Sequence, residues 1–221
     1  MNIIKRVQWG ARQPKQTPVV IDVTVHDVFV HHSATPAPLP NDEVAAMRSV
    51  QNYHMDTNGW NDIGYSFVVM PSGNVYEGRG WGVVGAHTEG HNSTGYGICV
   101  EGNYMQELPA LAALQSVAAL IDAGIAEKWI TVVQVFGHRD VFATACPGDN
   151  LYSKLDLIRG LVKGQPTVTN PEPTPPAEID THSPLQFFVP TPSGKGYWMV
   201  AQDGAVFAFG DAAYYGRVWV K

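Results

Sequence analysis

The sequence is poor in charged residues. Asp, Glu, Lys and Arg together make up 15% of the 221 residues, whereas about 25% is usual in globular proteins. The 20 acidic residues outnumber the 14 basic ones, and the formal net charge is −6. Binding to nucleic-acid phosphates needs a basic face, so the composition predicts no nucleic-acid partner. The hydrophobic fraction of 45% is enough for a packed core and excludes disorder over most of the chain.

Cysteines and long apolar runs are also scarce. The two cysteines, Cys99 and Cys146, cannot form a disulfide framework, although one bridge between them is possible. No run of about 18 apolar residues is present, so we expect no span and no membrane partner. The N-terminal segment MNIIKRVQWGARQPK lacks the apolar stretch of a secretory signal. We therefore expect a protein made in the cytoplasm without a signal peptide.

Several common catalytic motifs are missing. The sequence contains no HExxH, CxxC or G-x-S-x-G, no P-loop, and no GxGxxG that opens a helix. Nucleotide binding and α/β-hydrolase chemistry therefore lack support.

Proline, by contrast, is concentrated in one segment. Residues 164–184 hold six prolines and few apolar residues, which is typical of an extended, semi-rigid linker. We therefore predict a main domain over 1–163, a linker over 164–184 and a small module over 185–221.

Strand and helix patterns alternate along the main domain. Segments rich in β-branched residues predict strands, and apolar residues at helical spacing predict helices. This alternation predicts an α/β domain with a central sheet covered by helices. The predicted strands are 23–35, 94–104 and 130–140, with a hairpin over 65–81 around Pro71–Asn74; the predicted helices are 40–59, 108–129 and 151–162.

Two histidines and a cysteine are candidate metal ligands. His31 closes one predicted strand, His138 closes another, and Cys146 follows in the same loop. If the two strands are neighbours, the loop can bring Cys146 to both histidines. Two His and one Cys suit Zn²⁺, and three protein ligands leave the fourth position open, as in catalytic sites. The alternative is two hydrogen-bonded strand-end histidines and a small buried cysteine, and the spacing alone does not decide between them.

A series of longer motifs runs in order through residues 5–160. Through these motifs the chain resembles the peptidoglycan recognition protein and type-2 N-acetylmuramoyl-L-alanine amidase family, which includes phage lysozyme-type amidases. The motifs are VQWGAR (7–12), VFVHHSAT (28–35), VQNYHMDTNGWNDIGYSFVV (50–69), VYEGRGWGVVGAHTEGHN (75–92), GYGICVEGN (95–103) and GHRDVFATACPG (137–148).

The resemblance implies a fold and a metal site. The fold is a central mixed β-sheet with helices on both faces, and the active members bind one zinc ion through His, His and Cys. Carried over to this sequence, the ligands are His31, His138 and Cys146. Neighbouring residues on a strand point to opposite faces, so only one of His31 and His32 can join this set. The family pattern indicates His31, and His32 is the alternative.

The resemblance also implies two helper residues. Tyr65 occupies the position of the family's active-site tyrosine, whose hydroxyl can stabilise an oxyanion or position water. The alternative is a core aromatic residue at the start of a strand. Thr144 lies two residues before Cys146, where family amidases carry Lys or Thr. It has no charge to offer, so we expect it to support the site by hydrogen bonding or to cap the loop.

Five further residues are expected to line the groove for glycan and peptide. Aromatic faces suit sugar rings, and a guanidinium suits a peptide carboxylate. Each of the five could equally pack in the core or anchor a loop. Cys99 is expected to be a buried free thiol, and Glu101 is either an acid that supports the site or a charge at a strand end. The five groove candidates are His87, Asn92, Trp60, Trp81 and Arg79.

The C-terminal module resembles the GYW-x-VA-x-DG-x-VF-x-FGDA repeat of actinobacterial surface and wall-associated proteins, in one copy. Tyr197–Val200 and Ala205–Phe209 flank Gln202-Asp203-Gly204, which predicts a β-hairpin. The module is too short to bury a core of its own, yet it is rich in aromatic residues. We therefore expect it to associate with other copies of the chain or to bind the wall, rather than to dock on the main domain.

Together, these resemblances imply a zinc-dependent amidase that cleaves the bond between the lactyl group of N-acetylmuramic acid and L-alanine in peptidoglycan. The expected setting is a phage endolysin, made in the host cytoplasm and released through a holin. The alternative is a non-catalytic peptidoglycan-binding protein, although the presence of all three ligand candidates and Tyr65 argues against it.

Overall fold

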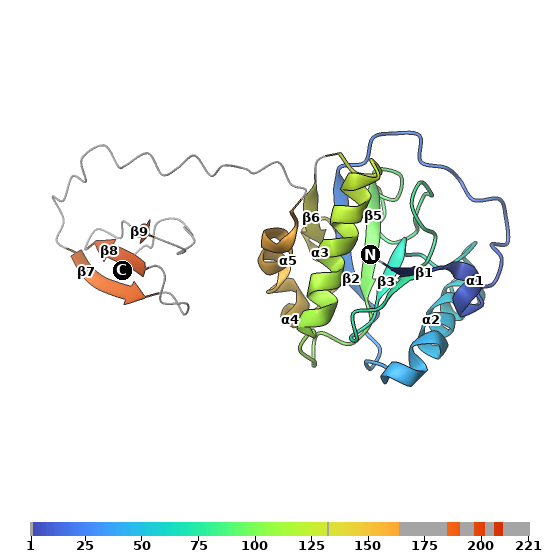
Figure 1. Cartoon of the computed structure of the whole chain (residues 1–221), viewed down its shortest axis with the longest axis horizontal. Helices are drawn as coiled ribbons and strands as arrows, with labels where there is room; N and C mark the ends of the chain where they lie inside the picture. Colours follow the sequence, from blue (N-terminus) through green and yellow to red (C-terminus); the bar gives the residue numbers. More distant parts are fainter. Residues whose placement is uncertain (1, 132, 164–184, 191–196, 202–205, 210–221) are drawn as a thin grey trace. The chain divides into compact units, whose positions relative to one another are not determined.

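The computed structural model describes residues 2–131, 133–163, 185–190, 197–201 and 206–209. The chain divides into two compact units, Met1–Pro166 and Thr167–Lys221 (Figure 1). The predicted linker over 164–184 lies outside the described residues.

A six-stranded mixed sheet forms the centre of the first unit. Its order is β1-β4-β3-β5-β2-β6. β2 lies between β5 and β6 and runs parallel to both, whereas β3 and β4 pair antiparallel. The predicted mixed sheet and the predicted hairpin are thereby confirmed. The strands are β1 (Ile3–Ile4), β2 (Asp27–His32), β3 (Phe67–Val69), β4 (Val75–Glu77), β5 (Gly95–Val100) and β6 (Gln134–Gly137).

Helices flank this sheet, and a hydrophobic cluster lies on each of its two faces. α3 and α5 cover one face (Figure 1), where Val28, Val30 and Ile98 join the larger cluster. Met47 of α2 and Trp9 of α1 join the smaller cluster on the other face. Alternate residues of a strand point to opposite faces, so β2 contributes to both layers. The helices are α1 (Arg6–Trp9), α2 (Glu43–Asn52), α3 (Leu111–Ala126), α4 (Asp149–Tyr152) and α5 (Leu155–Leu161).

Two predicted helices are broken in the structure. The segment predicted over 40–59 consists of the 3-10 turn η1 (Pro40–Asp42), α2, and the π-helical turn η2 (Tyr53–Thr57). The segment predicted over 151–162 is interrupted after Tyr152, where the Ser153 hydroxyl donates to the Asn150 carbonyl. Such side-chain bonds to the backbone compete with the helix.

Two elements near the N-terminus were not predicted. β1 has two residues and α1 has four, which is too short for either to show a periodic pattern.

The described part of the second unit is a three-stranded antiparallel sheet. β7 (Leu185–Pro190) pairs with β8 (Tyr197–Ala201), which pairs with β9 (Val206–Phe209). β8 and β9 are the two strands of the predicted hairpin, and β7 is an additional strand. The predicted turn, Gln202 to Gly204, lies outside the described residues.

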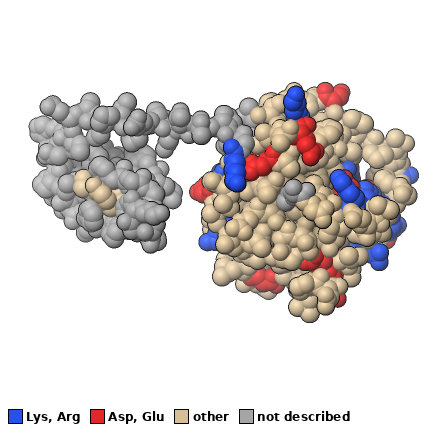
Figure 2. Space-filling model, viewed as in Figure 1, with Lys and Arg blue, Asp and Glu red and all other residues tan. Residues whose placement is uncertain are grey.

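None of the helices among the described residues is long and apolar enough to cross a membrane. On the face of the first unit shown in Figure 2, acidic and basic side chains are interspersed among other residues.

Candidate metal centre

Parallel pairing of β2 and β6 brings two histidines together. In this ladder Val30 pairs with Gly137, so the next residues along the two strands, His31 and His138, are neighbours. Their ring centroids lie 4.5 Å apart. Val30 points into the core beneath α3 and α5, and His31 therefore points to the opposite face.

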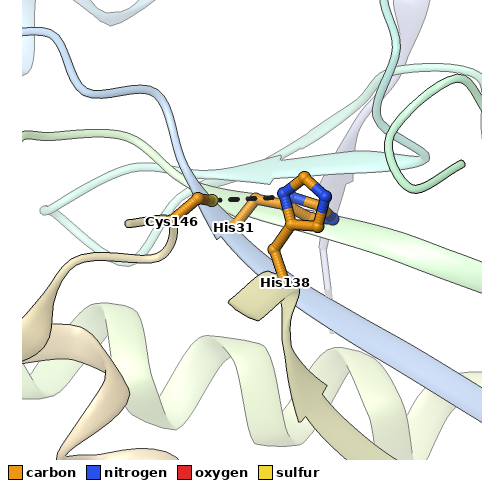
Figure 3. A group of neighbouring side chains, drawn as sticks. All are labelled: His31, His138 and Cys146. Carbon is orange, nitrogen blue, oxygen red and sulfur yellow. Dashed lines mark hydrogen bonds between the residues drawn. The ribbon is translucent and has the colours of Figure 1, made fainter. Parts of the chain in front are cut away.

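The loop after β6 returns Cys146 to these histidines. The backbone N–H of Arg139 donates to the Cys146 carbonyl at 3.0 Å, and its guanidinium donates to the Ala145 carbonyl at 2.6 Å. Cys146 Sγ lies 3.6 Å from His31 Nδ1. One ligand atom from each of His31, His138 and Cys146 lies within 4.8 Å of the others (Figure 3). The structure thus gathers the three predicted ligands.

His32 takes no part in this cluster. Its ring stacks on Tyr104 at a centroid distance of 6.5 Å, and its Nδ1 accepts from the Tyr104 backbone N–H at 3.3 Å. The strand alternation therefore separates the two histidines as expected and brings His31 to the cluster.

The two histidines of the cluster have the protonation state that a metal requires, whereas the cysteine must first lose a proton. Burial lowers the pKa of His31 well below 6.5 and also lowers that of His138, so both imidazoles are neutral near pH 7. Burial raises the pKa of the Cys146 thiol to about 11, and an arriving metal must displace its proton.

The surroundings of His31 also fit a metal ligand. The second ring nitrogen, Nε2, lies 3.3 Å from the Thr88 hydroxyl, which orients the ring with Nδ1 towards Cys146. Metal-bound histidines commonly hold their second nitrogen in this way. With two imidazoles and a thiolate as donors, the residues fit a zinc ion.

Tyr65 and Thr144 lie in the cavity of about 430 Å³ that surrounds the cluster. The Tyr65 ring centroid is 5.4 Å from that of His31. Burial raises the pKa of Tyr65 well above 10, so its hydroxyl keeps the proton it would donate. Thr144 Oγ1 accepts from the Cys146 backbone N–H at 3.2 Å. Thr144 therefore caps the loop and also faces the cavity.

His87, Asn92 and Trp60 line an adjoining cavity of about 380 Å³. Asn92 Oδ1 accepts from the backbone N–H groups of His87 at 2.7 Å and Thr88 at 3.0 Å, so it holds this loop together. Burial lowers the pKa of His87 to about 3. Its ring packs over Gly97, where a Cβ atom would lie only 2.3 Å from His87 Cγ. Of these three residues, only Trp60 has a substantially exposed side chain, 36% exposed.

Arg79 and Trp81 line neither of these two cavities, and their positions match the alternatives of a loop anchor and a core residue. The Arg79 guanidinium donates to the carbonyls of Ile63 and Val84, both at 2.7 Å, and faces a separate small pocket. The Trp81 ring packs against Phe67 at a centroid distance of 4.4 Å, within the core on the α3 side. Arg79 therefore anchors loops, and Trp81 belongs to the core.

Phe142 is a residue that the sequence analysis missed. Its ring stacks on His138 at a centroid distance of 5.4 Å and an angle of 23°. The side chain is 45% exposed and lines the same cavity as Trp60. The available signal was an aromatic residue four positions after a ligand candidate, in the loop that carries Cys146.

A third cavity, of about 560 Å³, lies on the other side of Tyr65. Tyr65 lines both this cavity and the one around the cluster. One wall comes from α2 and the turn after it, including Ala46, Val50 and His54, and Glu101 also lines it. Cys99 is buried and free, as expected from the sequence.

Comparisons with known proteins identify the family of the chain. A family model described as N-acetylmuramoyl-L-alanine amidase matches residues 22–149. An N-acetylmuramoyl-L-alanine amidase from Homo sapiens is 45% identical over 162 residues, which are 70% of this chain and 27% of the human protein. The match thus spans little more than a quarter of that relative.

Solved structures of peptidoglycan recognition proteins share the fold. The Drosophila protein LB has a TM-score of 0.67 at 36% identity, covering 70% of this chain and 92% of its own. Peptidoglycan recognition protein LE has a TM-score of 0.68 at 36% identity with the same coverage; its structure is a complex with tracheal cytotoxin, a monomeric diaminopimelic acid-type peptidoglycan. The family model covers more than half of the 221 residues, and the chain therefore belongs to the N-acetylmuramoyl-L-alanine amidase family.

Proposed function

We propose that this protein is a zinc-dependent amidase that cleaves the bond between the lactyl group of N-acetylmuramic acid and L-alanine in peptidoglycan. The observation that carries the proposal is the grouping of His31, His138 and Cys146 with ligand atoms within 4.8 Å of one another, beside Tyr65. Membership of the amidase family supports it, as does the name of the human relative. The complex of protein LE with a peptidoglycan fragment supports the substrate class.

In this proposal the zinc ion supplies the Lewis acid, and residues of the chain hold the ion in place. A zinc ion at this site would supply a Lewis acid and lower the pKa of water. His31 and His138 would bind as neutral imidazoles, and the Thr88 hydroxyl would hold the free nitrogen of His31. Cys146 would bind after losing its proton.

Tyr65 is the donor in this proposal. It keeps its proton at neutral pH because burial raises its pKa, so its hydroxyl can donate to the oxygen of the scissile carbonyl as negative charge develops there. A positioned donor of this kind stabilises the transition state more than the ground state. Thr144 holds the loop that presents Cys146 and so acts mainly by positioning the ligand.

The two flanking cavities suit the two halves of the substrate. The sugar fits the cavity with the exposed rings of Trp60 and Phe142, because aromatic faces pack well against the apolar face of a sugar. The peptide then lies on the other side of Tyr65, in the cavity walled by α2. This orientation puts the scissile carbonyl at the cluster.

We place the activity at the bacterial cell wall, as a phage endolysin released through a holin. The support is the sequence of the C-terminal unit, which resembles repeats of wall-associated proteins. Association of the chain with itself through this unit is part of the same proposal.

The decisive experiment tests cleavage on purified cell walls. The zinc-loaded protein should release peptides with free L-alanine amino termini, and a chelator should stop the release until zinc is restored. Binding to walls without any release of amino termini would contradict the amidase and favour a recognition protein.

A further inference from the structure

The cavity walled by α2 contains a buried carboxylate with an unused oxygen. Glu101 is 2% exposed. Its Oε1 accepts from the Thr35 hydroxyl at 2.8 Å, whereas Oε2 is buried and has no hydrogen-bond partner among the described residues. A buried polar atom without a partner costs free energy and is rare in native proteins.

The two neighbouring hydroxyls, those of Ser33 and Thr35, also make other hydrogen bonds. Ser33 Oγ lies 2.8 Å from Thr35 Oγ1 and accepts from the Gly102 backbone N–H at 3.0 Å. Thr35 in turn donates to Oε1 of Glu101. The chain of hydrogen bonds therefore ends at the carboxylate and leaves one acceptor oxygen unpaired, in a side chain that lines the cavity.

A second buried glutamate shows what full pairing looks like in this protein. Glu43 is also 2% exposed. Its Oε2 accepts from Asn74 Nδ2 at 2.8 Å and from the Tyr76 hydroxyl at 3.2 Å. Glu101 differs from Glu43 in that one of its oxygens, Oε2, is buried without a partner among the described residues.

From this contrast we infer that Glu101 is a substrate-binding residue whose Oε2 accepts a peptide N–H beyond the scissile bond. The inference rests on the proposed function for the identity of the substrate.

The cavity walls restrict the chemistry of the occupant. Pro36, Ala46 and Val50 supply apolar surface. Among the described residues, His54 is the only basic one that lines the cavity. Burial lowers its pKa to about 4, and its Nδ1 accepts from the Gly64 backbone N–H at 3.0 Å. A carboxylate ligand would find no cation here and would face Glu101. A peptide offers both N–H donors and apolar side chains.

The position of Glu101 makes it specific for one side of the substrate. The cavity meets the metal cluster at Tyr65, and the sugar-binding rings lie in the cavity on the other side of the cluster. Glu101 should therefore act on affinity for the peptide and have no role in the bond-breaking step.

The test is a double-mutant-type cycle that combines a substitution at Glu101 with N-methylation of the substrate and compares the KM values. The substrates are N-acetylmuramyl tripeptide and two analogues, each N-methylated at one of the two peptide bonds beyond the scissile amide. With the wild-type holoenzyme, one analogue should have a KM about tenfold higher than the parent, the scale of one hydrogen bond to a charged group. In Glu101→Leu, the KM for the parent should rise to that level, and N-methylation should have no further effect.

Two further variants separate binding from folding. Glu101→Gln keeps the size of the side chain, but retaining the Thr35 bond turns its NH₂ group towards the cavity, so it should also lose the N–H acceptor. Glu43→Gln should lower the melting temperature without changing the response to N-methylation. If Glu101 served only to hold Thr35, its variants would raise the KM of all three substrates equally, and the inference would fail.

Failure of the inference is distinguishable from failure of the proposed function. An active wild-type enzyme whose KM ignores N-methylation would overturn the role of Glu101 and leave the amidase intact. An inactive wild-type protein would overturn the amidase. The same cycle measured as Kd by calorimetry would then still decide whether Glu101 binds the peptide N–H.

Discussion

Replacing Cys146 by Ser tests the metal centre most directly. The structure makes Cys146 the only one of the three ligand candidates that must lose a proton near pH 7, because the pKa of its thiol is about 11 while those of His31 and His138 lie below 6.5. The substitution removes a thiolate donor and leaves a neutral hydroxyl, which is a much poorer zinc ligand. Activity should fall by orders of magnitude.

The pKa of the Cys146 thiol also determines how zinc binding depends on pH. At pH 7 a group with a pKa of about 11 is ionised in about one chain in ten thousand. Displacing its proton over these four pH units therefore costs about 5.5 kcal/mol, at about 1.4 kcal/mol per pH unit. This cost falls as the pH rises, so the zinc affinity contributed by the thiol should increase about tenfold from pH 7 to pH 8.

Calorimetry in buffers with different ionisation enthalpies counts the protons released on zinc binding. The wild-type protein should release about one proton more than Cys146→Ser, because protons from any other group are common to both. Competition with a coloured zinc chelator at pH 7 and 8 should show the matching difference in slope. Cys99→Ser is the control for metal binding, since Cys99 is buried and absent from the cluster.

Three results would refute the reasoning. Cys146→Ser could bind zinc with the same affinity and proton release as the wild type. Cys99→Ser could be the variant that loses the metal. A disulfide between the two cysteines could be found, whereas the structure has both as free thiols.

Three more predictions concern catalysis, acid stability and the second unit. Tyr65→Phe should lower kcat by about 10²-fold, the scale of one lost oxyanion donor, with zinc content and KM nearly unchanged; wild-type turnover would remove Tyr65 from the mechanism. The folded-state pKa of His54, about 4, lies below its unfolded value of about 6.5, so the unfolded chain binds protons first and stability is lost as the pH falls from 6.5 towards 4. That loss, roughly 3 kcal/mol at most, should shrink in His54→Gln when urea unfolding is measured with chelator present; equal losses in both proteins would contradict it. A chain ending at Pro166, the end of the first compact unit, should keep its melting temperature and its activity on soluble muropeptides, but should bind walls less or no longer self-associate in light scattering; loss of soluble activity would make the second unit part of the amidase fold.

Local sequence was sufficient for the longer elements of the main domain and for the candidate ligands. The β-branched runs, the turn at Pro71–Asn74 and the apolar spacing in 111–126 are properties of neighbouring residues, and the structure contains the corresponding hairpin and helix. Motifs around His31, His138 and Cys146 indicated the candidate ligands for the same reason, since each motif is a short segment of sequence.

The directions of side chains required the tertiary structure. Strand alternation shows that His31 and His32 point to opposite faces, but only the packing of Val30 beneath α3 and α5 shows which face holds the cluster. Trp81 lies between Gly80 and Gly82, both with positive φ, 79° and 72°. Left-handed residues of this kind turn the chain sharply, and here Trp81 packs into the core. Trp81 is close in sequence to residues that line the cavities, but the fold directs its side chain into the core.

Glu101 shows most clearly what depends on long-range contacts. In the sequence it is an acid at the end of a strand, and nothing in its neighbours indicates a missing partner. Its unpaired oxygen exists only because Thr35, distant in the chain, bonds to the other one. Residues of α2 line the same cavity as Glu101, although they lie about fifty positions earlier in the chain. Hydrogen-bond satisfaction is a property of atoms brought together by folding, so only the three-dimensional arrangement could reveal it.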